Sequence, residues 1–328
     1  MTHASNDPIV AVAPMMDWTD RHCRYFLRLL DPRARLYTEM LTAEAVVHGN
    51  AERLLQFDPA EHPVALQLGG SDPALMAAAA RTGARVGYDE ININVGCPSD
   101  RVQSGAFGAC LMDDPGRVAE CVRAMREATG VPVTVKMRIG IDDRDSYAFL
   151  CDFLEPVVDA GCDTFLVHAR KAILAGLSPK ENRTVPPLDH ERVYRLKREH
   201  PHLTIVLNGG ISSTADARRH LEQVDGVMIG REAYQNPWFL VELERALCGA
   251  SIELPRDRQA VVRRMLPYIE AQLAAGTELK HITRHMLGLF AGVPGARRWR
   301  RHLSEQAHRP GAGVEVVEAA LEQLPIAA

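Results

Sequence analysis

A lysine lies inside one of the apolar runs of this sequence, where a charged side chain is unusual. Lys136 stands between Val135 and Met137, in a stretch rich in β-branched residues. Burying an ammonium group is costly unless an anion or a hydrogen-bond acceptor meets it. Two roles account for such a lysine: it can stabilise negative charge on a cofactor ring, or it can act as a Schiff-base nucleophile.

Cys97 is the cysteine whose position is most suggestive of chemistry. It comes directly after a strand-like run and before Pro98, which ends that run. A thiol at such a place serves as a nucleophile or as a general acid, and no histidine nearby in the sequence decides between the two. The other six cysteines are expected to be small apolar core residues. Seven scattered cysteines without a CxxC pair indicate neither a disulfide framework nor a zinc site.

Further polar residues recur where apolar runs end, and they come from six different runs. Residues two apart on a strand share a face, and the carboxyl ends of the strands of a parallel barrel form its active site. Six runs with polar ends favour one polar site built by many strands over six unrelated surface positions. These residues are Gln67, Asn92, Asn94, Lys136, Arg138, His168, Arg170, Asn208 and Arg231.

Two glycine-containing loops predict a phosphate site. Gly209 and Gly210 follow Asn208, and Gly230 precedes Arg231, each between a strand-like run and a helical one. Glycines let backbone N–H groups approach an anion, and helix amino ends favour negative charge. Barrels often hold a phosphate at their last two loops. One such pocket suits a mononucleotide or a sugar phosphate.

Eight short apolar runs, separated by helical patterns, must position these residues. They predict an α/β fold, the (β/α)8 or TIM barrel. An open doubly wound sheet would place a glycine-rich loop after the first strand, and the sequence has no glycine there. The runs cover residues 9–16, 36–40, 64–68, 90–95, 131–139, 164–167, 204–207 and 226–229.

A small all-helical C-terminal domain is expected after the barrel, so that residues 1–248 form the catalytic domain and residues 249–328 the helical one. Helical patterns cover residues 256–275, 278–290, 295–307 and 314–323. Residues 251–310 hold 11 Lys and Arg against 5 Asp and Glu, a balance of +6 that leaves −10 for the rest. Four arginines surround Trp299 at residues 297–301, which favours a surface for a phosphate backbone.

The 328 residues carry a formal net charge of −4 and include 46% hydrophobic residues, which excludes wholesale disorder. No apolar run reaches the roughly 18–20 residues of a membrane helix, and the polar start predicts no signal peptide. We therefore expect a cytoplasmic protein without a membrane contact. His281 and His285 have the spacing of helical zinc ligands, but no acidic or cysteine ligand accompanies them, so no metal is expected.

Taken together, these motifs make the chain similar to the tRNA-dihydrouridine synthases, and within them to the A-type subfamily. The resemblance extends over nearly the whole length, and its strand-end motifs occur in the family's order. The shared motifs cover residues 12–15, 17–21, 66–70, 92–99, 135–140, 168–170, 208–211 and 229–231, and the A-type signatures cover residues 176–183 and 295–301.

The resemblance implies an FMN-dependent enzyme that uses NADPH to reduce uridines of the tRNA D-loop, at positions 20 and 20a, to 5,6-dihydrouridine. In such enzymes a hydride passes from flavin N5 to uracil C6, and Cys97 would protonate C5 as a general acid. The resemblance places the isoalloxazine ring of FMN against Pro14, Met15, Met16, Gln67, Lys136 and His168, and the ribityl phosphate against Asn208, Gly209, Gly210, Gly230 and Arg231.

The resemblance further implies that tRNA contacts Asn94, Lys180, Arg183, Arg297 and Arg300, with Asn94 reading the edge of a uracil that has left the base stack. We expect a monomer. Two alternatives stay open: an FMN-dependent reductase of a small enone or free pyrimidine, and an RNA-binding barrel without catalysis. The basic helical region argues against the first, and Lys136 and Cys97 argue against the second.

Overall fold

The computed structural model describes residues 7–99, 105–248 and 252–324. Within these ranges the strands form one parallel sheet that closes on itself, because β1 pairs with β2 and β9 while β2 also pairs with β4. The strands are β1 (Ile9–Val12), β2 (Arg35–Tyr37), β3 (Leu41–Thr42), β4 (Val64–Gly69), β5 (Glu90–Val95), β6 (Val133–Arg138), β7 (Thr164–His168), β8 (Thr204–Asn208) and β9 (Gly226–Ile229).

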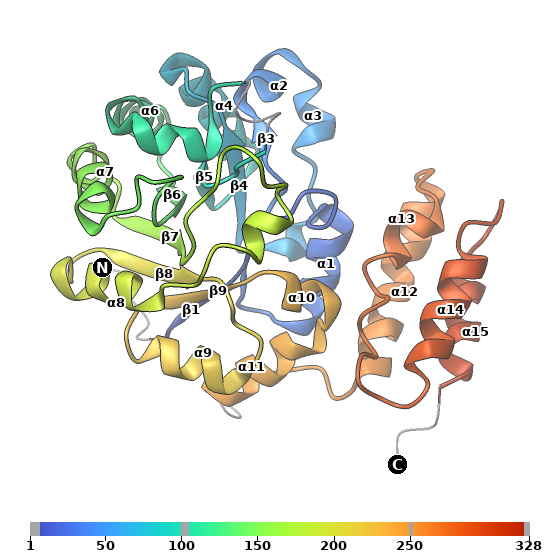
Figure 1. Ribbon diagram of the computed structural model, residues 1–328. Coiled ribbons are helices and arrows are strands. Elements are labelled where there is room, and N and C mark those ends of the chain that lie inside the picture. The colour runs from blue at the N-terminus through green and yellow to red at the C-terminus, as the bar shows by residue number, and fades with distance from the viewer. Residues whose placement is uncertain (1–6, 100–104, 249–251, 325–328) are drawn as a thin grey trace.

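Helices surround this barrel (Figure 1). They are α1 (Arg21–Leu30), α2 (Ala43–His48), α3 (Ala51–Leu54), α4 (Pro73–Val86), α6 (Pro115–Ala128), α7 (Tyr147–Asp159), α8 (His190–Glu199), α9 (Thr214–Leu221), α10 (Arg231–Gln235) and α11 (Trp238–Cys248), with 3-10 turns η1 (Pro59–Glu61), η2 (Gly108–Asp113) and η3 (Glu181–Arg183). Asp72 and Asp114 cap α4 and α6, and each precedes a proline whose fixed φ suits the first helical turn.

The prediction of a (β/α)8 barrel is confirmed, and each of the eight apolar runs overlaps a strand. The structure adds β3, a short strand that extends the edge of β4. β1 ends at Val12 rather than at Met16, because the chain then turns and the Met15 carbonyl accepts the N–H groups of Trp18 and Thr19.

Two apolar cores hold the barrel. The larger one lies between the strands and the surrounding helices. The smaller one fills part of the barrel interior with side chains from six strands, and its members are Ala11, Ala13, Tyr37, Ala65, Leu166, Val206 and Met228. Small alanines on β1 and β4 leave room inside the barrel, and buried polar side chains of β4, β5 and β6 occupy it.

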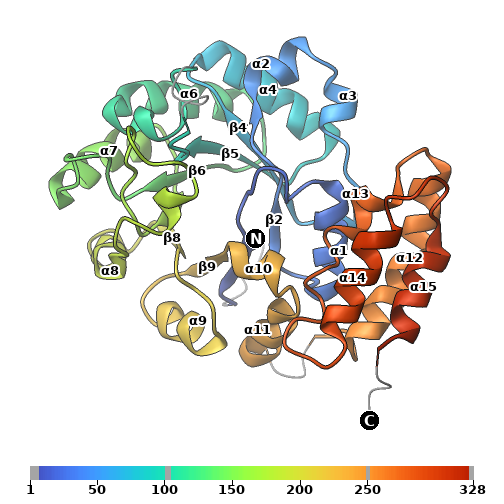
Figure 2. The same cartoon turned by 45° about the vertical axis from the view of Figure 1, so that its right-hand side comes forward.

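The helices α12 (Arg258–Ala274), α13 (Leu279–Thr283), α14 (Ala296–Gln306) and α15 (Val314–Glu322) follow the barrel. Figures 1 and 2 show them beside α1. Tyr268 of α12 stacks on Tyr25 of α1 with ring centroids 3.8 Å apart, and its hydroxyl lies 2.8 Å from His22 Nδ1. The expected domain boundary after residue 248 falls at residues 249–251, which lie outside the described residues.

For three of the four expected C-terminal helices, the first and last residues lie within two residues of the predicted ones. The helix expected over residues 278–290 instead ends at Thr283, and turns follow it. A Cβ at Gly288 would lie 2.5 Å from the Gln235 carbonyl oxygen, so the chain there packs against the backbone of α10. In the described parts of the chain, no helix is both long enough and apolar enough to cross a membrane.

Candidate active site at the barrel mouth

Gln67, Asn94 and Cys97 come together where β4 and β5 end. Asn94 Nδ2 donates to Gln67 Oε1 at 2.9 Å, and Asn94 Oδ1 accepts the backbone N–H groups of Gly96 and Cys97 at 3.0 Å each. The Asn94 amide therefore shapes the turn that carries the thiol. Cys97 Sγ lies 3.4 Å from Ser99 Oγ, and its side chain is partly exposed at the mouth.

Lys136 points into the barrel from the middle of β6, as its flanking residues predict. Its Nζ lies 3.3 Å from Asn208 Oδ1 on β8, and Asn208 in turn donates to the Met228 carbonyl at 2.7 Å. Burial, together with the neighbouring Arg138 guanidinium, lowers the pKa of Lys136 to about 7. An anion beside Nζ would reverse this shift, because it favours the charged form.

Positive side chains gather around the mouth. Burial is the main cause that lowers the pKa of His168 well below its ordinary value, and four nearby cations lower it further, so the imidazole is neutral near pH 7. Those cations are Arg138, Lys136, Arg170 and Arg183. Burial and the charge of Arg231 also lower the pKa of both Arg170 and Arg183. Among the described residues, no carboxylate forms an ion pair with any of these groups.

Gly209 and Gly210 follow β8 with φ values of 114° and 79°, a backbone region that favours glycine. A Cβ at Gly209 would lie 2.8 Å from His168 Cδ2, and one at Gly210 would lie 2.6 Å from Leu188 Cδ1. A Cβ at Gly230 would meet nothing within 4 Å. Backbone N–H groups can thus approach a ligand closely beside His168, as the glycine loops predict.

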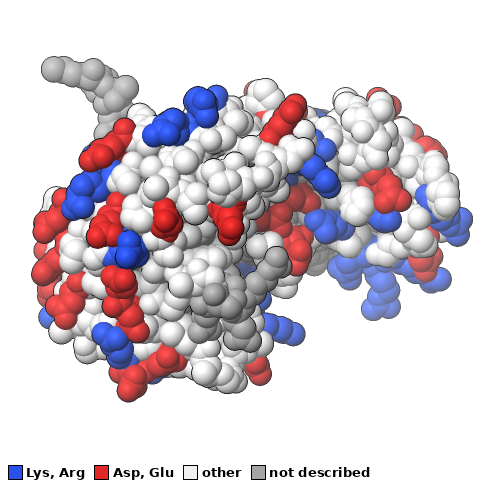
Figure 3. All heavy atoms as spheres, turned by 90° about the horizontal axis from the view of Figure 1, so that it is seen from above, with Lys and Arg blue, Asp and Glu red and all other residues white. Residues whose placement is uncertain are grey.

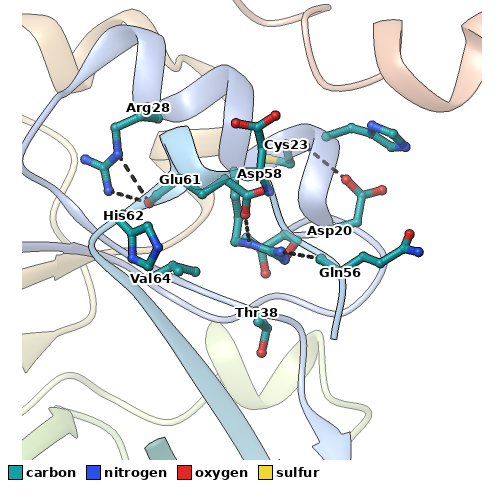
Figure 4. A network of polar contacts seen from close by, with 12 residues as sticks. Asp20, Cys23, Arg28, Thr38, Gln56, Asp58, Glu61, His62 and Val64 are labelled. Atoms are coloured by element: carbon teal, nitrogen blue, oxygen red, sulfur yellow. Dashed lines mark hydrogen bonds and ion pairs between the residues drawn. The ribbon is translucent and has the colours of Figure 1, made fainter. Parts of the chain in front are cut away.

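The loop after β1 carries Pro14, Met15 and Met16, and its shape is set locally. Met15 N–H donates to Thr19 Oγ1 at 2.9 Å, while Met16 is 57% exposed. A buried ion pair lies beneath the loop, since Arg24 Nη1 donates to the Thr19 carbonyl at 2.8 Å and Arg24 Nε lies 2.6 Å from Glu61 Oε2. Figure 4 shows Glu61 within this network, with Arg28 beside it and Asp20 next to Cys23.

The loop after β7 brings Arg183 to the mouth and leaves Lys180 exposed. The buried Asn182 between them stabilises the loop, because its side-chain amide accepts the Ile173 N–H at 2.7 Å and donates to the Ile173 carbonyl at 2.9 Å. Arg231 Nη2 lies 3.3 Å from the Arg183 carbonyl oxygen. Residues far apart in sequence thus line one side of the mouth.

Arg297 and Arg300 lie on α14, in the helical segment and not at the mouth. Trp299 between them is fully buried, packs edge-on against Phe290 and donates from Nε1 to the Met286 carbonyl at 3.0 Å. The tryptophan thus turns the arginines to the exposed face of the helix. Figure 3 shows Lys and Arg projecting from the side of the molecule where this segment lies.

The sequence assigned no ligand role to Arg138, although it shares a face of β6 with Lys136. Its Nε lies 3.1 Å from the Gly96 carbonyl, and its Nη1 lies 3.0 Å from the Asn182 carbonyl. Arg138 therefore ties the Cys97 turn to the loop after β7. The alternation of polar residues at 134, 136 and 138 is the signal that indicates such a role.

The described residues contain no group of three or more His, Cys, Asp or Glu side chains placed to hold a metal ion. His281 lies 3.3 Å from Glu278 Oε2. His285 is buried 3.0 Å from Asp20, so both histidines contact carboxylates of the protein.

A closed parallel barrel with glycine loops and several cations at its carboxyl end is typical of (β/α)8 enzymes. The family model for dihydrouridine synthases matches residues 11–324, and the chain belongs to that family, whose members are flavin-dependent oxidoreductases. A protein named tRNA-dihydrouridine(20/20a) synthase from Escherichia coli is 61% identical over 313 residues, which is 95% of this chain and 90% of the relative. One of the same name from Vibrio cholerae is 58% identical over 327 residues, which is 99% and 98% of the two chains.

Proposed function

We propose that this protein reduces uridines 20 and 20a of the tRNA D-loop to 5,6-dihydrouridine, with bound FMN and with NADPH as reductant. The observation that supports the proposal is the barrel mouth, where Cys97 lies among cations that have no carboxylate partner within the described ranges. The chain is 58–61% identical to synthases of that name, and this identity supports the same reaction here. We further propose that the enzyme acts as a monomer in the cytoplasm, without a metal ion.

The residues at the mouth fit FMN. A phosphate would meet Arg231 and the N–H groups after Asn208, where only glycine leaves room for a close approach. The exposed Met16 and its neighbours Pro14 and Met15 offer an apolar surface for a planar ring, and such a surface is costly to leave in water. Lys136 lacks an anion among the described residues and would meet the polar edge of that ring.

FMN, once reduced by NADPH, would supply a hydride to uracil C6. The residues of this chain would stabilise the ring, supply the proton and position the uracil. Lys136 would hold negative charge on the ring, and His168, which is neutral near pH 7, would donate or accept one hydrogen bond there. Cys97 would transfer the proton of its Sγ to uracil C5 as a general acid. Asn94 would face the uracil edge with the N–H of Nδ2 that Gln67 does not accept.

A uracil can reach this mouth only after it leaves the base stack. We propose that Lys180 and Arg183 contact the tRNA near the flipped nucleotide, and that Arg297 and Arg300 contact the backbone farther away. Residues 1–248 would then form the catalytic domain and residues 249–328 the tRNA-binding domain. A small substrate would need no second basic surface of this kind, which favours tRNA over a free pyrimidine or enone.

The test combines the purified protein with tRNA that is isolated from a strain without this protein. Bound flavin is released and identified, and dihydrouridine is mapped after incubation with NADPH. We expect released FMN and new dihydrouridine at positions 20 and 20a. Reduction of free uridine instead of tRNA would support the small-molecule alternative. Tight tRNA binding without any flavin would support the binding module. Either result would overturn the proposal.

A further inference from the structure

A chain of buried side chains crosses the interior of the barrel, from its amino-terminal end to the Cys97 turn. At the amino-terminal end, Glu90 Oε2 lies 2.7 Å from Arg35 Nη1, and Glu90 Oε1 accepts the hydroxyl groups of Tyr37 at 2.7 Å and Thr134 at 2.5 Å. Asn92 Nδ2 donates to Thr134 Oγ1 at 2.8 Å.

The chain continues toward the mouth through two more amides. Gln67 Nε2 donates to Asn92 Oδ1 at 2.8 Å, and Asn94 Nδ2 donates to Gln67 Oε1 at 2.9 Å. Asn94 Oδ1 closes the chain on the N–H groups of Gly96 and Cys97. The strands make this chain possible: Glu90, Asn92 and Asn94 lie on one face of β5, and Asn92 is in register with Gln67 on β4 and with Thr134 on β6.

The groups at both ends of the chain require the same donor-to-acceptor direction of its hydrogen bonds. An amide can present either its oxygen or its NH2 group to a neighbour, so its own shape does not decide its orientation. The Glu90 carboxylate, held by Arg35, only accepts hydrogen bonds, and the backbone N–H groups at the other end only donate. Every donor in the chain therefore points from the Cys97 turn toward Glu90, and a flip of any one amide would bring two donors or two acceptors together.

From this polarity we infer that Glu90 is a positioning residue for the active site. Although it lies at the amino-terminal end of the barrel, it fixes which way the Gln67 and Asn94 amides face at the mouth, together with the backbone N–H groups of Gly96 and Cys97. Through Asn94 it also supports the turn that carries Cys97. The inference rests on the proposed function, in which Gln67 faces the flavin ring and Asn94 the uracil.

Glu90→Gln tests the inference with little change in shape. Arg35 would attract the new carbonyl oxygen and turn the new NH2 group toward Thr134. Thr134 would then donate to Asn92, and the chain would run in the wrong direction from that end. Because the N–H groups of the Cys97 turn still require the original direction, a Thr134 hydroxyl that turns toward Asn92 places a mismatch on Asn92, Gln67 or Asn94, and the amide signals report whether it turns. Thr134→Val removes the link itself and serves as the second variant.

Tyr37→Phe is the matched control. It removes one hydroxyl group from the same oxygen of Glu90, but Tyr37 does not lead to Gln67. All variants are purified with bound flavin, labelled with 15N at Asn and Gln side chains, and examined by 15N–1H spectroscopy. The signals of Gln67 and Asn94 are assigned with Gln67→Glu and Asn94→Asp. Uridine reduction is measured on the same samples, with kcat and KM for tRNA determined separately.

We expect Glu90→Gln and Thr134→Val to shift or split the amide signals of Gln67 and Asn94 and to lower kcat by about tenfold or more. KM for tRNA and the signals in Tyr37→Phe should stay as in the wild type. The inference is overturned if both variants match Tyr37→Phe in spectra and kcat, or if all three disturb the two amides equally. Failure of the proposed function is recognised separately, because the wild type would then lack FMN or tRNA reduction whatever the amide signals show.

Discussion

Cys97 and Lys136 are the two side chains at the mouth whose protons matter most for the proposed chemistry. Asn94 Oδ1 accepts the backbone N–H of Cys97 and so supports the turn that carries the thiol. We expect the Cys97→Ala variant to bind FMN and to let NADPH reduce that FMN as in the wild type. Its rate of tRNA reduction should fall by about 100-fold or more, because a methyl group cannot protonate uracil C5. Flavin absorbance and dihydrouridine content measure the two halves of this prediction.

Cys110→Ala is the control for that substitution. Cys110 lies in η2, and its Sγ is 3.1 Å from the Phe107 carbonyl oxygen. Its removal should leave turnover unchanged. Near wild-type turnover in Cys97→Ala would contradict the role of the thiol as a general acid.

The pKa of Lys136 predicts how stability depends on pH. Because burial lowers this pKa from 10.5 to about 7, the unfolded chain binds a proton between these pH values that the folded protein does not. This group therefore raises the free energy of unfolding as the pH increases from about 7 to 10.5, and its cost is greatest below pH 7. In flavin-free protein at pH 6, Lys136→Met should have a Tm higher by about 2 °C or more. The difference should shrink by pH 9, and equal pH slopes in the two proteins would contradict the prediction.

At the scale of elements, one face of α14 packs against the protein core and its other face is available to bind tRNA. Trp299 faces the core, while Arg297 and Arg300 are exposed. We expect Arg297→Ala/Arg300→Ala to change the free energy of unfolding by no more than about 0.5 kcal/mol, as for most surface substitutions. Affinity for tRNA should fall, and the slope of log affinity against log salt should flatten by about two, one for each phosphate contact.

Arg301→Ala provides a matched control on the same helix, since Arg301 Nε already lies 2.7 Å from Glu305 Oε1. It should change tRNA affinity less than the double variant does. Loss of flavin or of thermal stability in the double variant would instead assign the two arginines a structural role.

At the scale of the whole molecule, Asp20 joins the helical segment to the barrel. It caps α1 by accepting the Cys23 N–H, and it lies 2.6 Å from Arg284 Nη2 and 3.0 Å from the buried His285. Burial alone would raise its pKa, but the hydrogen bonds and charges of His285, Cys23 and Arg284 outweigh burial and lower the pKa well below 3.8. The contact thus stabilises the fold above pH 3.8, and this contribution is lost as the pH falls further.

Asp20→Asn keeps the helix cap and removes the charge. We expect it to lower the free energy of unfolding at pH 7 by about 1–3 kcal/mol, because Arg284 and His285 lose a charged acceptor. Urea denaturation at pH 7 and at pH 3 measures the change, and the difference from the wild type should be smaller at pH 3. A deficit that is the same at both pH values would contradict a contribution from the charge.

The charge of the molecule is distributed unequally between two parts of the chain. The formal net charge of −4 combines +6 over residues 251–310 with −10 elsewhere. Such a distribution can orient a polyanion toward one face of the protein.

The sequence by itself determined the place of eight of the strands, the polar residues at their ends and the basic character of the helical segment. Apolar runs and alternation are local patterns, and a side chain two residues from another on a strand shares its face whatever the rest of the chain does. For this reason Lys136 and Arg138 were recognisable as inward-facing before any partner was known.

Only the tertiary structure decided which of these side chains meet. Gln67 bonds to Asn94 because β4 lies beside β5 in one register. The helix expected over residues 278–290 ends at Thr283, and Gly288 beyond it packs against the backbone of α10. The charge of Arg231 reaches Arg170 because β7 and β9, which these residues follow, lie on either side of β8. Register and strand order depend on contacts between residues that are distant in sequence, and a local pattern carries no information about them.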